Sequence, residues 1–314
     1  MNQIVPEHKS AAKVTKAQDS HALLHEMIRS FTTLARTLNL SHAVKELGST
    51  RQTVRRHITQ LEEAKGTPLF IVEDRQYRLT DAGEKALPEA LNILALGNSW
   101  LSGHLQNYQG LPLVQKTHSD GWSFWQQQRP IGELWTSSRP LLRESLRAWA
   151  RAGGALEDSE MEHVRPYFVV FRDTPNGWIC VELGDECSYV SWFGWSHARS
   201  SIGRVLEQLL AGDDFGRLVN MPYEEVHRSM GLRLDHIHTQ MHREGTNALV
   251  PISYQRLLMG GRFPDGSFAL LSVVDRCYDL RIEGLENTQI RSMPKDLVME
   301  VDENVLKFGR KSKR

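Results

Sequence analysis

A run of helical periodicity near the N-terminus most restricts what this chain can fold into. Val54, Ile58 and Leu61 recur at spacings of four and three, which places them on one face of a helix predicted to run towards Lys65. The other face carries long side chains that donate hydrogen bonds, and such donors in the first turns of an exposed helix suit the DNA major groove. The residues expected to meet DNA from this helix are Thr50, Arg51, Gln52, Arg55, Arg56 and Thr59, of which Arg51, Gln52 and Arg55 are the candidates for base edges.

The flanking segments predict a winged helix-turn-helix over residues 21–83. A short helix is expected over residues 41–47, a tight turn at Gly48, and an N-cap at Ser49 or Thr50. After Gly66, a possible C-cap, the run from Leu69 to Leu79 reads as a hairpin with a charged tip. Arg75 and Arg78 would meet phosphates from this wing. The alternative is a small helical bundle whose arginines are merely solvated.

From roughly residue 23 to 91, in one register without gaps, the chain resembles the winged helix-turn-helix of LysR-type transcriptional regulators. The matching positions are Ala43, Leu47, Thr50, Val54, Arg56, Ile58, Leu61-Glu62-Glu63, Gly66, Leu69-Phe70, Arg75 and Leu79-Thr80-Asp81-Ala82-Gly83-Glu84. The chain departs from the family at Gln52, Arg55 and Val72, where proline, serine and a basic residue are usual. The resemblance implies binding to double-stranded DNA by a homodimer or a dimer of dimers, with an unusual operator.

Length and charge agree with more than one domain. The 314 residues are 40% hydrophobic and 24% charged, as in ordinary globular proteins. The net charge of zero hides a division, because residues 1–80 hold 12 Lys and Arg against 8 Asp and Glu, whereas the middle of the chain is acidic. Five basic residues then fall in the last eight. The acidic middle of the chain would not attract DNA, so the basic residues expected to attract it are confined to the two ends of the sequence.

Residues 84–109 are expected to form the linker helix that pairs two subunits in LysR-type regulators. Pro88 lacks a backbone donor and Gly97 weakens a helix, which predicts a kinked or two-part helix. The alternative is a core helix of a monomer. The tryptophan-rich residues 110–163 are expected to form a helical connector, including an amphipathic helix in RPLLRESLRAWARAG. Residues 1–20 are polar and expected to form a mobile arm.

Residues 164–283 predict an α+β domain with an antiparallel sheet. The segments expected as strands are PYFVVFRDT, GWICVELG, SYVSWFGW, LVPISYQRLLMGG and SFALLSVVDRC, and those expected as helices are SSIGRVLEQLLAG and MPYEEVHRSMGLRLDHIHTQM. Repeated βαβ units of a LysR-type effector domain are missing from this pattern. The order instead resembles a PAS-type sensor, whose final strands also flank a turn like Asp265-Gly266-Ser267. Residues 284–314 form a C-terminal extension with a basic tail.

Two groups of residues are candidates for a ligand or metal. The aromatic residues Tyr189, Trp192, Phe193 and Trp195 could line a pocket for a small-molecule effector, or simply form the core. Asp235, His236, His238 and His242 lie close in sequence, and two of these histidines could face one metal if the stretch were helical. Packed or solvated histidines are the better reading, so no metal and no cofactor is expected.

The preferred hypothesis is a sequence-specific DNA-binding regulator with a PAS-like sensory domain. Its rivals are an interaction sensor that does not bind DNA and a metal-dependent enzyme in the C-terminal domain, although no nucleophile or phosphate-loop motif is present. No apolar run reaches the ~20 residues of a membrane helix, and no signal segment opens the chain, so a cytoplasmic protein is expected. The three cysteines form no metal-binding pattern.

Overall fold

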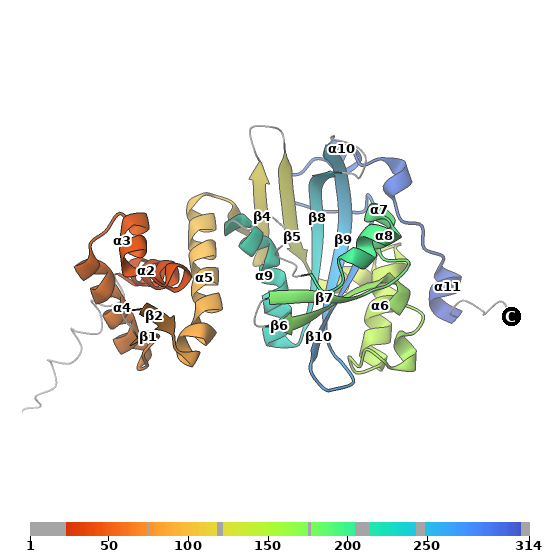
Figure 1. Ribbon diagram of the computed structural model, residues 1–314. Helices are drawn as coiled ribbons and strands as arrows, with labels where there is room; N and C mark the ends of the chain where they lie inside the picture. Colours follow the sequence, from red (N-terminus) through yellow and green to blue (C-terminus); the bar gives the residue numbers. More distant parts are fainter. Residues whose placement is uncertain are drawn as a thin grey trace, which may run out of the picture. The chain divides into compact units, whose positions relative to one another are not determined.

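The computed structural model describes residues 23–73, 76–117, 122–174, 177–204, 214–242 and 249–308 (Figure 1). The expected N-terminal arm, Arg75 and the basic residues of the tail from residue 309 lie outside these ranges. The chain divides into two compact units, residues 1–98 and 99–314. Within the described residues, no helix combines the length and apolar composition that a membrane span requires.

The N-terminal unit is a three-helix core followed by a small hairpin and a long helix, as the sequence predicts. Its elements are α2 (Leu24–Thr37), α3 (Leu40–Leu47), α4 (Arg51–Lys65), β1 (Phe70–Glu73), β2 (Gln76–Leu79) and α5 (Asp81–Leu101). Phe31 of α2 meets Phe70 edge-to-face, with ring centroids 5.6 Å apart. The buried core also contains Val54, Ile58 and Leu61, the periodic residues of α4. Their spacing therefore identified the buried face correctly.

Helix α5 contradicts the two-part form of the linker helix expected over residues 84–109, and it stops short of residue 109. It is one uninterrupted helix of 21 residues that passes through Pro88 and ends at Leu101. Ala86 and Ala90 are buried in the core of the N-terminal unit, whereas Pro88 and Glu89 are exposed. Packing of this face supports the helix across the proline, which costs roughly 3 kcal/mol in an isolated helix interior.

The C-terminal unit is built on an eight-stranded antiparallel sheet in the order β3-β4-β5-β8-β9-β10-β6-β7. The strands are β3 (Leu105–Tyr108), β4 (Leu111–Thr117), β5 (Ser123–Arg129), β6 (Phe168–Thr174), β7 (Gly177–Leu183), β8 (Leu232–His242), β9 (Leu249–Arg262) and β10 (Phe268–Arg276). An antiparallel α+β domain is therefore confirmed. The sheet is larger than expected because three of its strands come from the segment before Pro130.

Helical elements cover both faces of this sheet (Figure 1). The elements of one face are η1 (Ile131–Trp135), α6 (Pro140–Arg151), η2 (Ser159–Met161) and η3 (Arg165–Tyr167), and those of the other are α7 (Ser188–Phe193), α8 (Trp195–Ser200) and α9 (Asp214–Ser229). Leu141 and Met161 pack on Leu257 and Val273 on the first face. The C-terminal elements are α10 (Asn287–Ile290), η5 (Lys295–Leu297) and α11 (Glu303–Phe308), and Leu306 of α11 is buried in that same core.

Three local expectations for this unit were wrong. The start of the proposed helical connector, residues 110–163, forms β4 and β5 before α6 begins. The run SYVSWFGW, expected as a strand, forms α7 and the start of α8. Gly194, at φ 77°, separates these two short helices. The long helix expected over residues 221–241 ends at Ser229, where Met230 adopts a left-handed φ of 50°, and β8 follows. Apolar periodicity alone could not separate short buried strands from helices here.

Candidate nucleic-acid interface

Helix α4 is built to leave one side exposed. Thr50 caps it, with its side-chain oxygen accepting from the backbone N–H of Thr53 at 3.1 Å, so the N-cap lies at Thr50 rather than Ser49. Gly66 closes the helix at φ 68°, a left-handed conformation that favours glycine. At 3.6 residues per turn, the side chains of Arg51, Gln52, Arg55, Arg56 and Thr59 fall within an arc of about 140°, and Thr50 lies at the N-cap. Each of them is exposed: Thr50, Arg51, Gln52, Arg55, Arg56 and Thr59.

The exposed polar side chains of α4 differ in whether they already form hydrogen bonds within the protein. Gln52, Arg55 and Arg56 form no hydrogen bond or ion pair with any described residue, so their donors are available to an outside partner. Arg51 donates from Nη2 to Ser41 Oγ of α3 at 2.8 Å. Thr50 is engaged in the cap and also shares a 2.9 Å hydroxyl contact with Thr53. The predicted residues are therefore brought together, and Gln52, Arg55 and Arg56 are the most available among them.

The wing is present as β1 and β2, paired antiparallel with Phe70 opposite Leu79. Arg78 is exposed and forms an ion pair with Glu73 across the hairpin, with 3.1 Å between Nη1 and Oε2. An exposed pair of this kind is worth less than about 1 kcal/mol, so it leaves Arg78 able to exchange its partner for a phosphate. Arg75 lies outside the described residues.

Two side chains that hold α4, the wing and α5 together were matched to a motif in the sequence but given no role there. Glu62 Oε1 accepts from the backbone N–H groups of Leu69 and Phe70, at 2.7 and 3.1 Å, and so joins the end of α4 to the start of the wing. Thr80 Oγ1 donates to the Pro68 carbonyl at 2.7 Å and accepts from the Gly83 backbone N–H at 3.0 Å. These contacts explain why a glutamate and a threonine occur at those positions.

Gly83 allows α5 to approach the wing closely. A Cβ atom at this position would lie 2.2 Å from the Leu69 carbonyl oxygen, which is far inside van der Waals contact. Leu79, which lies beside Gly83 in the fold, packs against the hydrophobic core of the unit. The Leu-Thr-x-Ala-Gly segment thus connects the wing to α5 through hydrogen bonds and close packing.

A buried polar contact inside the domain also escaped sequence reasoning. His57, on the inner face of α4, lies 2.9 Å through Nδ1 from Ser30 Oγ of α2, and both residues are buried. Burial lowers the pKa of His57 and the Arg56 guanidinium adds to this effect. His57 therefore stays neutral at neutral pH and serves packing, which the helical spacing of one histidine could not reveal.

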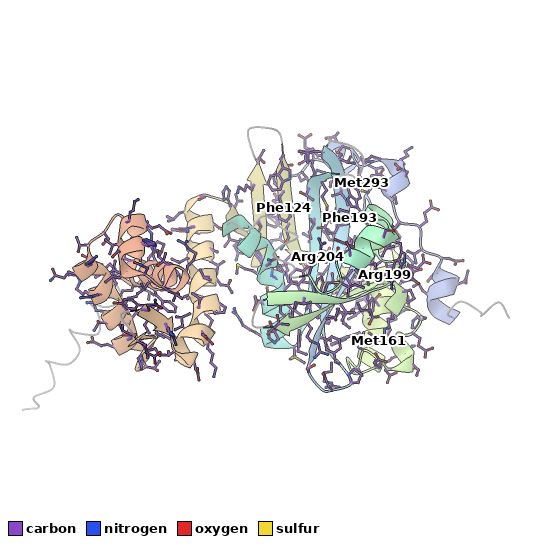
Figure 2. The ribbon with its side chains drawn as sticks, viewed as in Figure 1. Phe124, Met161, Phe193, Arg199, Arg204 and Met293 are labelled. Carbon is purple, nitrogen blue, oxygen red and sulfur yellow. The ribbon has the colours of Figure 1, made fainter. Side chains whose placement is uncertain are left out.

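The aromatic residues proposed for an effector pocket occupy different environments. Trp192 is 7% exposed and packs with Ile252, Met293 and Leu297, whereas Trp195 is 48% exposed. Tyr189 and Phe193 are half-buried with ring centroids 4.6 Å apart. Figure 2 labels Phe193 and Met293 within this cluster. A role in binding an effector stays a prediction for these four residues.

The histidine-rich segment, residues 235–242, is part of strand β8. A metal site shared by two of its histidines required this segment to be helical, so the geometric basis for that site is absent. His238 Nδ1 contacts Ser253 Oγ at 2.8 Å, His236 Nδ1 accepts from the Arg281 backbone N–H at 2.9 Å, and Asp235 pairs with arginines on the opposite face. Among the described residues, no group of three or more acidic, histidine or cysteine side chains is arranged to hold a metal.

These features define the N-terminal unit as a winged helix-turn-helix domain of the kind that binds DNA. Residues 25–84 match the family model described as the bacterial regulatory helix-turn-helix protein of the lysR family. The domain is therefore a LysR-family helix-turn-helix domain.

Two relatives illustrate how far this similarity reaches. The HTH-type transcriptional regulator BudR of Klebsiella aerogenes is 39% identical over 74 residues, which cover 24% of this chain and 52% of that protein. The HTH-type transcriptional regulator XapR of Escherichia coli K12 is 26% identical over 201 residues, 63% of this chain and 66% of that protein. The chain thus spans about half to nearly two thirds of these relatives.

Two solved structures are each similar to about a quarter of this chain. Oxidized OxyR of Corynebacterium glutamicum is 29% identical, with 25% of this chain and 26% of that chain covered and a TM-score of 0.25. A complex of the CbnR DNA-binding domain with DNA is 26% identical, with 25% and 91% covered and a TM-score of 0.24. With TM-scores this low, the solved structures add nothing to the family match.

Proposed function

We propose that this protein is a transcriptional regulator that recognises a double-stranded DNA site as a homodimer. The observation that carries the proposal is the exposed, unengaged set of Gln52, Arg55 and Arg56 on the second helix of a LysR-family helix-turn-helix. Arginine can pair with guanine and glutamine with adenine in the major groove, whereas Arg78 of the wing would hold a phosphate. Arg51 would exchange Ser41 for a base edge.

The dimer would form along α5, with a dimer of dimers as the larger assembly. Ile93 and Trp100 lie seven residues apart, so they share a side of the helix, and they are 51% and 70% exposed. Leu101 is 71% exposed in the last turn. Large apolar side chains exposed on one helix favour a second copy of the same helix as partner.

The C-terminal unit would be a PAS-like sensory domain that responds to a small molecule and changes the angle between the DNA-binding heads. The unit keeps an order of strands, helices and strands, with β6 and β7 before α7–α9 and three strands after them, instead of the three before and two after that the sequence pattern predicted. The turn between β9 and β10 contains Asp265-Gly266-Ser267, in which the Ser267 N–H donates to Asp265 Oδ1 at 2.9 Å. This order supports the proposal without specifying the effector.

The decisive experiment is genome-wide immunoprecipitation of the tagged protein beside its Arg51→Ala/Arg55→Ala variant. The proposal expects discrete peaks that share a palindromic motif and disappear in the variant. Absence of reproducible peaks under several growth conditions, together with partner binding that does not weaken with salt, would instead favour an interaction sensor that does not bind DNA. Stoichiometric metal in the purified protein would favour an enzyme.

A further inference from the structure

A polar cavity lies on the sheet face that α6 covers, away from the aromatic residues of α7 and α8. Its volume is about 200 Å³, which is small beside the roughly 300–1,000 Å³ of pockets for drug-sized ligands. Strands β8 and β9 supply its floor, and η1 with the segment after it and the chain after β10 supply its walls. The residues that line it are Glu133, Leu134, Thr136, Ser137, Ser138, Leu234, His236, Gln255, Asp279 and Arg281.

Two deeply buried polar side chains lie next to each other at this cavity. His236 and Gln255 are directly opposite in the β8–β9 ladder, so their side chains share a face of the sheet. They are 4% and 3% exposed. Polar groups buried to this degree normally have hydrogen-bond partners, so any unused donor or acceptor on them indicates what a ligand should offer.

Hydrogen bonds to the neighbouring backbone show which side-chain atoms of His236 and Gln255 are left without a partner. His236 Nδ1 accepts from the Arg281 backbone N–H at 2.9 Å, which leaves the imidazole proton on Nε2. Gln255 Nε2 donates to the Asp279 carbonyl, which identifies Oε1 as the free amide oxygen. Among the described residues neither His236 Nε2 nor Gln255 Oε1 has a partner. A neutral N–H donor therefore lies beside a neutral acceptor.

The imidazole stays neutral because of its surroundings. Burial lowers the pKa of His236 to about 4, and the nearby Arg129 acts in the same direction. The second proton that would turn Nδ1 into a donor would also break the bond from Arg281. His236 consequently presents one N–H to the cavity at neutral pH.

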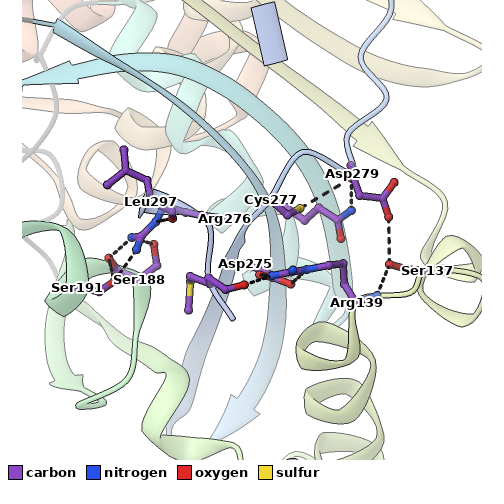
Figure 3. Close-up of polar contacts among 11 residues, drawn as sticks. Ser137, Arg139, Ser188, Ser191, Asp275, Arg276, Cys277, Asp279 and Leu297 are labelled. Atoms are coloured by element: carbon purple, nitrogen blue, oxygen red, sulfur yellow. Dashed lines mark hydrogen bonds and ion pairs between the residues drawn. The ribbon is translucent and has the colours of Figure 1, made fainter. Parts of the chain in front are cut away.

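The walls of the cavity are tied to the domain core by polar contacts that Figure 3 shows. Ser137 Oγ lies 3.4 Å from Asp279 Oδ2 and accepts from the Arg139 backbone N–H at 3.1 Å. Arg139 in turn donates from Nε to Asp275 Oδ2 of β10 at 2.9 Å. These contacts hold the segment after η1 against the chain that follows β10, so the cavity is formed before a ligand arrives.

We propose that this cavity binds a small molecule whose carbonyl oxygen lies beside an N–H, as in a lactam or an unsubstituted amide. The carbonyl would accept from His236 Nε2 while the adjacent N–H donates to Gln255 Oε1. Apolar atoms of the ligand would rest on Leu134 and Leu234, which lie among the lining residues. The inference deepens the sensory half of the proposed function, although binding itself requires no DNA.

Ligand-observed saturation-transfer NMR on the full chain tests this, with 2-pyrrolidinone as probe and N-methyl-2-pyrrolidinone as its matched control. The control keeps the carbonyl and ring but lacks the N–H. We expect saturation transfer to the lactam and roughly tenfold weaker binding of the methylated ring, because Gln255 Oε1 would be buried without a partner. Equal binding of the two rings, or no binding of either at millimolar concentration, overturns the proposal.

A blocking variant locates the binding. Ser138 is an exposed residue of the lining, and Ser138→Trp should fill the cavity and abolish the signal, whereas Ser196→Trp, at an exposed site of α8, should leave it unchanged. A signal that survives Ser138→Trp places the lactam elsewhere and overturns the site. Because these measurements contain no DNA, their failure would leave the immunoprecipitation result intact, and failed immunoprecipitation would leave the binding result intact.

Discussion

Arginine is used in opposite ways in the two units of this protein. In the N-terminal unit, Arg55 and Arg56 project from α4 into solvent and pair with no described residue. In the C-terminal unit, Arg233 and Arg256 are 4% and 5% exposed and both pair with Asp235, which is fully buried. Arg139 similarly pairs with the fully buried Asp275 (Figure 3).

A basic residue therefore indicates a nucleic-acid surface only when its own fold leaves it unpaired. Burial opposes the charge of Arg256, but Tyr223 and Asp235 more than compensate, so the pKa of Arg256 lies above its ordinary value. That guanidinium is a structural cation inside the domain. The free guanidinium groups of α4 are available for an outside anion instead.

The largest effect should follow from removing the shared carboxylate of the buried cluster. Asp235→Ala leaves the buried guanidinium of Arg256 without its carboxylate partner and that of Arg233 with Glu225 alone, and we expect a loss of about 3–5 kcal/mol in the free energy of unfolding. Urea unfolding followed by circular dichroism measures it. Glu225→Ala is the matched control, because Glu225 also pairs with Arg233 but its side chain is 53% exposed. Equal losses in the two variants would contradict the importance of burial.

Acid should destabilise the C-terminal unit through its buried histidines. Burial lowers the pKa of His236 and of His238 to about 4, below the ordinary 6.5. Below about pH 6.5 these histidines are protonated in the unfolded chain but remain neutral in the folded chain. The free energy of unfolding therefore falls as the pH drops towards 4. The loss should approach about 3 kcal/mol for each imidazole.

Urea unfolding at pH 7.5, 5.5 and 4.5 checks this slope. The variant His238→Gln removes one of the two titrating groups without adding charge, so its stability should fall less steeply with acid. Parallel curves for the variant and the unchanged protein would show that His238 does not contribute.

An exposed arginine of α4 should affect DNA recognition far more than stability. Arg55→Ala should lose about 1–3 kcal/mol of discrimination between operator and random DNA, while unfolding changes by less than about 0.5 kcal/mol. Fluorescence anisotropy at fixed salt measures the discrimination. Lys65→Ala removes one charge from the last turn of the same helix and should weaken both DNAs alike, and the same behaviour in Arg55→Ala would exclude base reading.

The smallest effect is expected for a solvent-exposed ion pair. Arg36 and Glu46 are paired in the N-terminal unit with exposed side chains. Glu46→Ala should change the free energy of unfolding by less than about 1 kcal/mol, because water already solvates both groups. A loss comparable to that of Asp235→Ala would break the comparison between exposed and buried pairs.

Long-range pairing limited what could be predicted for the C-terminal unit. Strand β5 pairs with β8 more than a hundred residues later, so Trp125 lies opposite His238. Nothing within the local pattern around Trp125 indicates that partner, and tryptophan density suggested a connector instead. The cavity at His236 and Gln255 is likewise built from distant segments, because its lining joins residues 133–138 to strands β8 and β9 and to the chain after β10.

The helix-turn-helix unit could be predicted from the sequence alone, because the information that specifies it is local. Val54, Ile58 and Leu61 specify the buried side of α4 by their spacing, and the same spacing leaves Gln52, Arg55 and Arg56 exposed. The folded structure was needed to show which arginines of the C-terminal unit are neutralised inside the protein and where a polar cavity forms. Those outcomes depend on contacts between segments that local spacing does not bring together, such as Arg139 with Asp275, and a buried charge is stabilised by the partner that the fold places beside it.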